Sequence, residues 1–202
     1  MDRKAIKAEA KAKIKGNLWT IWKPILVVGL ISGVLGGILG AVCDTESTSY
    51  NVASTVVELA LMPLTVGVVY YMLKFTRGEN PVVNDIFGFY KKFLPILAVT
   101  LLVGFFTGLG FILLVVPGVI IALMLSQVYY LMADGKTDVF GVLKESKEMM
   151  YGHKWEYFVF LLSFLGWILL VGVTFGIAAI YVVPYMNVAE CIYYEKLKAL
   201  KK

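Results

Sequence analysis

Two long segments without a single charged residue constrain this chain more than any other feature. Residues 93–133 and residues 157–189 contain no Asp, Glu, Lys or Arg over 41 and 33 positions, respectively. A helix needs about 20 apolar residues to cross the hydrocarbon core of a bilayer, so each segment is long enough for a helical hairpin. A soluble core does not explain two such segments in a chain of 202 residues, 59% of them hydrophobic.

Two shorter apolar segments, at residues 24–43 and 52–73, precede the long ones. The first long segment is expected to turn near Thr107–Gly110 or near Pro117–Gly118, and the second near Gly172–Gly176. We therefore predict an all-α polytopic membrane protein with six transmembrane helices in three hairpins, plus amphipathic cytoplasmic interfacial helices. Within a single integral membrane domain over residues 1–202, the hairpins cover residues 24–73, 93–133 and 157–194, after a basic cytoplasmic helix at residues 1–23.

The basic residues are distributed unevenly around these predicted spans. All 19 Lys and Arg residues fall before the first span, between the second and third, between the fourth and fifth, or after the sixth, where Lys202 is the last. The positive-inside rule then places both termini in the cytoplasm and residues 44–51 outside a cell membrane that the chain crosses several times. The net charge of +5 needs no nucleic-acid partner, because the predicted cytoplasmic loops face a bilayer with an anionic inner leaflet.

The basic segment at residues 1–23 does not read as a cleaved signal peptide. A signal peptide has a short basic region, a short apolar region and a small-residue cleavage site. Here a long basic segment precedes a full-length apolar span, so we expect it to be retained.

The charged stretch before the last long apolar segment predicts a helix lying in the membrane interface. The helix is expected to begin at Thr137 or Asp138 and to end at Gly152. At 100° per residue, its apolar face holds Val139, Val142, Leu143, Ser146, Met149 and Met150. The single histidine, His153, follows this helix. It reads as an interfacial residue, with a general base or pH sensor as the alternative.

Three segments in the second half of the chain carry a family resemblance. They read "PGVIIALMLSQVYYLMADGKTD", "ESKEMMYGHKWEYFVFLLSFLGWILL" and "VTFGIAAIYVVPYMNVAECIYYEKL". The chain resembles the bacterial integral-membrane family called domain of unknown function 975, most specifically over residues 117–197. The matching motif positions are Ser146, Met150, Gly152, Lys154, Ser163, Phe164, Gly166, Trp167, Pro184, Tyr185, Tyr194 and Glu195, whereas Leu165 stands where isoleucine is usual. The resemblance implies a bacterial multi-pass membrane protein and supplies no activity, because the family is uncharacterised.

The first predicted span contains a doubled ridge of small residues. Gly29, Gly33 and Gly37 are four positions apart, as are Ser32, Gly36 and Gly40. Such ridges let transmembrane helices pack closely, and we expect a helix-packing face whose partner lies in this chain or in another one. Lining for a narrow pore or a lipid groove is the alternative.

Four polar residues within the predicted spans form the candidate intramembrane site: Glu58, Gln127, Asn187 and Glu190. A carboxyl group inside a membrane is costly and is a functional hypothesis by default. Glu58 is expected to face the helix bundle, where it carries a proton or contacts a cationic substrate. The alternatives are a neutral glutamic acid hydrogen-bonded to a neighbouring helix and a side chain that faces outer water. Glu190 is expected to lie near the cytoplasmic interface.

Motifs of known enzymes, metal sites and cofactor sites are absent from the sequence. The two cysteines, Cys43 and Cys191, fit no metal-binding spacing, and the predicted topology places them at opposite membrane faces. We therefore expect no enzyme, no cofactor and no metal. The first hypothesis is a non-enzymatic accessory or regulatory membrane factor that binds another membrane protein or a second copy of itself. The alternative is a small transporter or channel for a lipid or small solute that uses Glu58.

A weak internal repeat divides the chain into three hairpin units. Each return span ends in a tyrosine pair, at residues 70–71, 129–130 and 193–194, and each approach to a hairpin contains a glycine, at Gly16, Gly88 or Gly152. If the repeat is real, the three hairpins run in the same sense around an axis along the membrane normal. Aromatic residues that concentrate at membrane interfaces are the alternative origin of the pattern.

Overall fold

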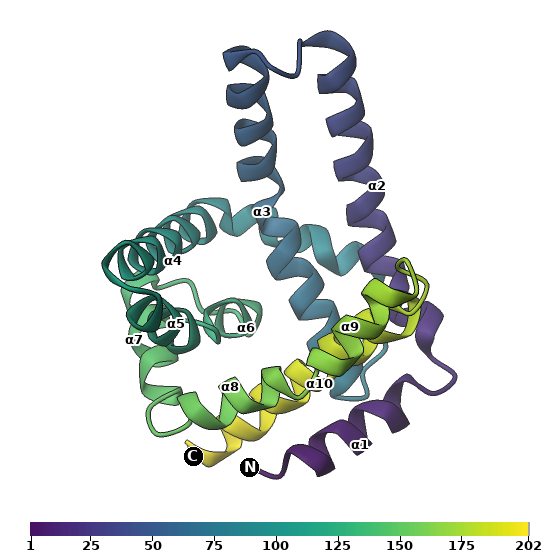
Figure 1. The fold of residues 1–202 in the computed structure, drawn as a ribbon, viewed down its shortest axis with the longest axis vertical. Coiled ribbons are helices and arrows are strands. Elements are labelled where there is room, and N and C mark those ends of the chain that lie inside the picture. Colours follow the sequence, from purple (N-terminus) through teal and green to yellow (C-terminus); the bar gives the residue numbers. More distant parts are fainter. Residues whose placement is uncertain (202) are drawn as a thin grey trace.

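The computed structural model describes residues 1–201, and every regular element in that part of the chain is a helix. The all-α prediction is confirmed, and Lys202 lies outside the described residues. Figure 1 shows the arrangement. The elements are α1 (Arg3–Ile14), α2 (Leu18–Val42), α3 (Thr48–Thr76), the 3₁₀ helix η1 (Val83–Lys92), α4 (Phe93–Leu113), α5 (Val115–Met124), α6 (Val128–Ala133), α7 (Val139–Met149), α8 (Lys154–Leu162), α9 (Leu165–Val173) and α10 (Ala179–Leu200).

The α2–α3 hairpin projects away from the remaining helices (Figure 1). Its helices have 25 and 29 residues, and α3 begins where the Ser47 hydroxyl accepts a hydrogen bond from the Tyr50 amide at 3.1 Å. This is the usual way in which serine satisfies a free amide at a helix start. Large apolar side chains such as Leu30 and Val34 are exposed along α2, as expected for a surface that contacts lipid or protein.

The α4–α5 hairpin closes at Leu114, whose backbone is extended. The turn therefore lies between the two predicted positions, four residues after Gly110 and three residues before Pro117. The helices approach very closely across the turn, because a Cβ atom on Gly110 would lie 2.9 Å from the Cα of Gly118. The predicted glycine turns are in fact the place where two helix backbones touch.

The third hairpin turns where the sequence predicts. Between α9 and α10, Phe175 and Gly176 have φ angles of 49° and 90°, in the left-handed region that reverses a chain. The incoming helix is interrupted at Ser163 and Phe164, which separate α8 from α9.

Five helical segments are long and apolar enough to cross a membrane: Leu18–Val42, Thr48–Thr76, Val83–Leu113, Val115–Ala133 and Lys154–Val173. This supports a multi-pass membrane protein. Within the described residues, α10 is not among these segments. It carries Glu190, Glu195, Lys196 and Lys198 and is packed into the core, so the sixth span stays a prediction.

The amphipathic segments are helical, and α7 follows the sequence prediction closely. Asp138 precedes its first residue, and Gly152 adopts φ 80° just after it. Val142, Leu143, Ser146, Met149 and Met150 are buried, with Val139 partly buried, while Lys144 and Glu148 are exposed. Similarly, α1 buries Ile6, Ala10 and Ile14.

Each amphipathic element packs on the return helix of another hairpin: η1 on α3, α7 on α6, and α1 on α10. The backbones of η1 and α3 are in close contact, because a Cβ atom on Gly67 would lie 2.2 Å from the Ile86 carbonyl oxygen. In Figure 1, however, the turns of the three hairpins point in different directions. The arrangement of the three hairpins in the same sense around an axis along the membrane normal stays a prediction.

Candidate functional site

A polar cluster joins the ends of α3, α6 and α10. Arg77 follows α3, Asp134 follows α6, and Glu195 lies near the end of α10. One terminal nitrogen of the Arg77 guanidinium donates to Asp134 Oδ1 at 2.6 Å and to Glu195 Oε1 at 2.5 Å. A single cation thus holds together two carboxylates from two other helices. We call the set Arg77, Asp134, Tyr194, Glu195 and Lys198 the polar junction.

Asp134 is the centre of the polar junction. Its Oδ2 atom accepts hydrogen bonds from the Tyr194 hydroxyl at 2.6 Å and from the Lys198 ammonium. Burial alone would raise the pKa of the Asp134 carboxyl, but the hydrogen bonds from Lys198, Tyr194 and Arg77 outweigh it and lower the pKa below the ordinary value of 3.8. Asp134 is therefore ionised at neutral pH, and its charge is compensated by two cations.

Two of the predicted tyrosine pairs meet beside the polar junction. The rings of Tyr130 and Tyr194 are stacked with their centroids 5.1 Å apart, and the Tyr130 hydroxyl donates to Glu190 Oε2 at 3.1 Å. The third pair contributes Tyr71, which is buried in α3 and donates to the Thr20 carbonyl oxygen at 2.9 Å. These contacts tie α6 to α10 and α3 to α2.

A cavity of about 520 Å³ lies next to the polar junction. Arg77 and Lys92 contribute positive charge to its wall, and Asp85 and Asp134 contribute negative charge. Asp85 is already paired with Lys74 at 3.0 Å. The charges of this cavity are thus largely compensated from within the protein. Among the described residues, no group of His, Cys, Asp and Glu side chains is arranged to hold a metal ion.

The four polar residues predicted within spans do not form one site. Gln127 is buried and donates to the Ser126 hydroxyl at 2.8 Å, and its Oε1 atom has no partner among the described residues. Asn187 donates to the Val183 carbonyl oxygen within α10 at 2.9 Å. Glu190, as described above, is bound by Tyr130 from α6. Gln127 directly precedes α6, the helix that carries Tyr130. Gln127 and Glu190 therefore lie in one region of the core.

Glu58 lies apart from this region. Its side chain is exposed on α3, and it makes no hydrogen bond or ion pair within residues 1–201. The prediction that Glu58 faces the helix bundle is therefore wrong for the single chain. The physical reason is that α3 extends beyond the helices that cover its other half (Figure 1).

The glycine ridge of α2 is uncovered. Gly29, Gly33, Gly36, Gly37 and Gly40 are exposed, and a Cβ atom on any of them would meet nothing within 4 Å. The sequence left open whether the helix that packs on this ridge belongs to the same chain or to another one. Within the described residues, no helix of the same chain covers the ridge.

The family-motif residues build a different part of the molecule, the packing around α8 and α9. The Ser146 hydroxyl donates to the Met124 carbonyl oxygen at 2.9 Å, which fixes α7 to the end of α5. Trp167 contacts Tyr185 at a centroid distance of 5.7 Å. Met150 and Pro184 are buried, Lys154 begins α8 beside Trp155, and Gly166 is exposed without close neighbours. Ser146, Met150, Trp167, Pro184 and Tyr185 therefore contribute to packing, and the Ser163 carbonyl oxygen also contacts Lys7 of α1.

Sequence reasoning did not single out Arg77, Asp134 or Lys198 as site residues. A signal was present in the spacing, because Asp134 and Lys198 each lie four positions after the second tyrosine of a pair. This spacing identifies a site only once the structure shows that α10 meets the end of α6 at Asp134.

One family model, "Protein of unknown function (DUF975)", matches residues 1–122 and 109–201. The match covers both halves of the chain, including the N-terminal half where the motif resemblance is weaker. The chain therefore belongs to this family. No curated protein and no solved structure matches it.

Proposed function

We propose that this member of the DUF975 family is a non-enzymatic accessory or regulatory membrane factor that docks its α2–α3 hairpin against a second membrane-spanning protein. The observation that carries the proposal is the uncovered glycine ridge of α2. Helices in membranes associate through small residues that let their backbones approach.

Glu58 supports the same proposal, because it lies on the other helix of the hairpin and is also uncovered. A carboxyl group in an apolar span is costly without a partner. A hydrogen-bond donor or a cation on a docked helix would supply one. The polar junction holds the base of the hairpin to the rest of the protein through Arg77, which leaves the distal part of the hairpin free to bind.

The proposed topology has six spans in three hairpins, with both termini in the cytoplasm. The distribution of the 19 Lys and Arg residues supports this orientation. The packing of η1 on α3, α7 on α6 and α1 on α10 supports descent of the hairpins from one repeated unit, because each approach segment contacts the return helix of another hairpin in a closed cycle.

Purification in mild detergent after cross-linking in native membranes tests the proposed function. The double variant Gly33→Leu and Gly37→Leu should lose the cross-linked partner, since bulky side chains would separate the helices. The single variant Gly108→Leu is the control, because Gly108 in α4 is equally open in the chain but lies outside the α2–α3 hairpin. Retention of the same partner by the ridge variant would contradict the proposal.

A small transporter for a lipid or small solute is the second candidate, and the exposed carboxyl of Glu58 within a span is the observation that favours it. Transport by protonation of Glu58 predicts that Glu58→Gln abolishes uptake while partner cross-linking is unchanged. Docking predicts that Glu58→Gln keeps the partner, because the amide still forms hydrogen bonds, whereas Glu58→Leu weakens its capture.

A further inference from the structure

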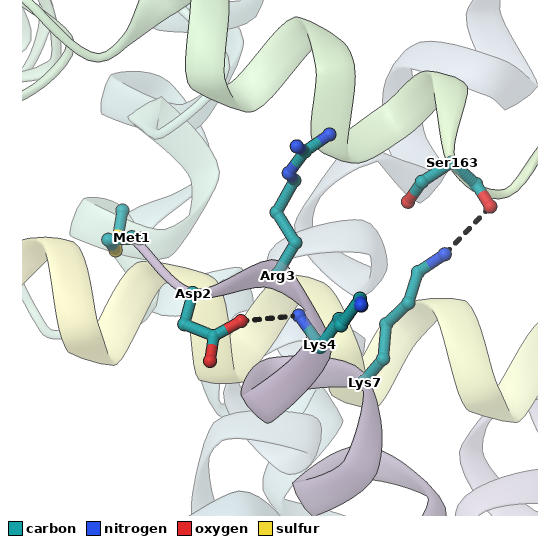
Figure 2. Close-up of a pocket in the computed structure, with 6 residues that line it drawn as sticks. All are labelled: Met1, Asp2, Arg3, Lys4, Lys7 and Ser163. Carbon is teal, nitrogen blue, oxygen red and sulfur yellow. Dashed lines mark hydrogen bonds between the residues drawn. The ribbon is translucent and has the colours of Figure 1, made fainter.

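A basic cavity lies between the start of α1 and the break that separates α8 from α9. It has a volume of about 410 Å³, within the range of about 300–1,000 Å³ typical of ligand pockets. Figure 2 shows its wall. The lining residues are Met1, Asp2, Arg3, Lys4, Lys7 and Ser163.

Within residues 1–201, three of the four cations that line the cavity have no ionised partner, whereas the Met1 terminal ammonium is paired with Glu156 at 3.2 Å. Within residues 1–201, the side chains of Arg3 and Lys4 make no ion pair, and Lys7 contacts only neutral groups. The one acidic residue, Asp2, is engaged as the cap of α1, where its carboxylate accepts from the Lys4 and Ala5 amides at 2.8 and 3.3 Å. The cavity therefore presents three cations to one partly satisfied anion.

Lys7 is held in place for binding an anion. Its ammonium donates to the Ser163 carbonyl oxygen at 2.7 Å and lies 4.3 Å from the centroid of the Phe164 ring. Burial lowers the pKa of Lys7, and the nearby positive charges of Lys11 and Arg3 lower it further. A bound anion would relieve this repulsion, and an ammonium already fixed by a carbonyl oxygen and an aromatic ring loses little freedom on binding.

The surroundings distinguish a lipid from a free anion. Ser163 lies within a candidate membrane span, Lys154–Val173. Leu162 and Leu165, which are close to Ser163 in the sequence, are exposed apolar residues and are available to acyl chains. On the other side, α1 buries its apolar face against α10, while Arg3 and Lys4 are exposed, as expected of an interfacial helix at an anionic membrane.

We propose that this cavity binds the phosphate of an anionic phospholipid headgroup, with Arg3, Lys4 and Lys7 as the phosphate ligands and the exposed leucines of α8 and α9 against the acyl chains. The site is independent of the proposed docking of the α2–α3 hairpin. It would fix α1 to the break in the third hairpin and make the packing of both depend on lipid composition.

Lipid binding by the full chain, measured by native mass spectrometry in detergent, tests the proposal with phosphatidylglycerol as the probe and zwitterionic phosphatidylcholine as the reference. We expect the unaltered chain to prefer phosphatidylglycerol by about tenfold or more. The triple variant Arg3→Gln, Lys4→Gln and Lys7→Gln should lose this preference. The control triple variant Lys13→Gln, Lys15→Gln and Lys23→Gln removes the same charge from the same region outside the cavity and should keep it.

Equal loss in both triple variants, or loss in neither, would overturn the proposal, because binding would then depend on net charge or on another surface. Within residues 1–201 the Lys4 side chain makes no hydrogen bond or ion pair, so Lys4→Gln alone guards against a folding defect. It should reduce the preference by about threefold, and an unchanged preference would count against the site. Displacement of phosphatidylglycerol by an equal concentration of inorganic phosphate would show a site for the free anion and refute the lipid assignment.

Discussion

Arg77 and Asp134 are 57 residues apart in the sequence and are joined by a hydrogen-bonded ion pair of 2.6 Å. Arg77 comes directly after the first hairpin, and Asp134 directly after the second. Because Glu195 and Lys198 from α10 bind the same two residues, this pair is where all three hairpins are connected. The junction thus adds polar contacts between distant helices to the buried apolar core.

Asp134→Asn should destabilise the protein by about 1–3 kcal/mol, because the Arg77 and Lys198 charges would lose their ionised partner while partly buried. Thermal unfolding in detergent, followed by circular dichroism, measures the change. Glu79→Gln removes an equal charge just after α3 from an exposed side chain and should have little effect. A similar loss in both variants would mean that net charge, not the junction, sets stability.

Stability should fall in acid through the same group. Since the pKa of Asp134 is lowered in the folded protein, its contribution is complete above its ordinary pKa of 3.8 and is lost as the pH falls below that value through the folded pKa. The midpoint of unfolding should therefore drop more steeply in this window for the unaltered chain than for Asp134→Asn. Parallel pH profiles for the two proteins would contradict the assignment.

Gly67→Ala should destabilise the contact between α3 and η1. The new Cβ would lie 2.2 Å from a backbone oxygen of Ile86, which cannot move away as a side chain can, so overpacking of about 1–3 kcal/mol is expected. Gly104→Ala is the control, because Gly104 is also helical and has open space around it. The unfolding temperatures of both variants provide the comparison.

Gly152→Ala should cost about 1–2 kcal/mol, the penalty for a side chain in the left-handed region. Gly152 has φ 80° at the turn between α7 and α8, and space alone is not limiting there. Gly166→Ala, at an open helical position, should be neutral or slightly stabilising. Equal unfolding temperatures for the two variants would show that the turn relaxes without strain.

Membrane sidedness can be measured with single cysteines and an impermeant thiol reagent. Cys191 is 2% exposed, so its failure to react would report burial and not sidedness. In a background with Cys43→Ser and Cys191→Ala, Thr45→Cys should react in intact cells, whereas Tyr151→Cys should react only after permeabilisation. Reaction of Tyr151→Cys from outside would refute the predicted orientation.

Local properties of the sequence were sufficient for the helical class, for the apolar segments and for the buried face of α7. The uncharged runs, the 3.6-residue periodicity between Asp138 and Gly152 and the glycine turn near Gly176 each depend on neighbours within a few positions, and the structure has them as predicted. Membership of the family was also recognisable, because its motif lies in one continuous region.

Tertiary structure decided everything that depends on which helices meet. Arg77, Asp134 and Glu195 become one cluster only because three helix ends converge, and Gly110 and Gly118 mark a backbone contact instead of a turn because α4 and α5 are apposed. Periodicity shows that Glu58 and the glycines of α2 lie on helices, but it does not show what covers them. Coverage is set by the packing of segments distant in the chain, and that packing leaves the outer α2–α3 hairpin bare.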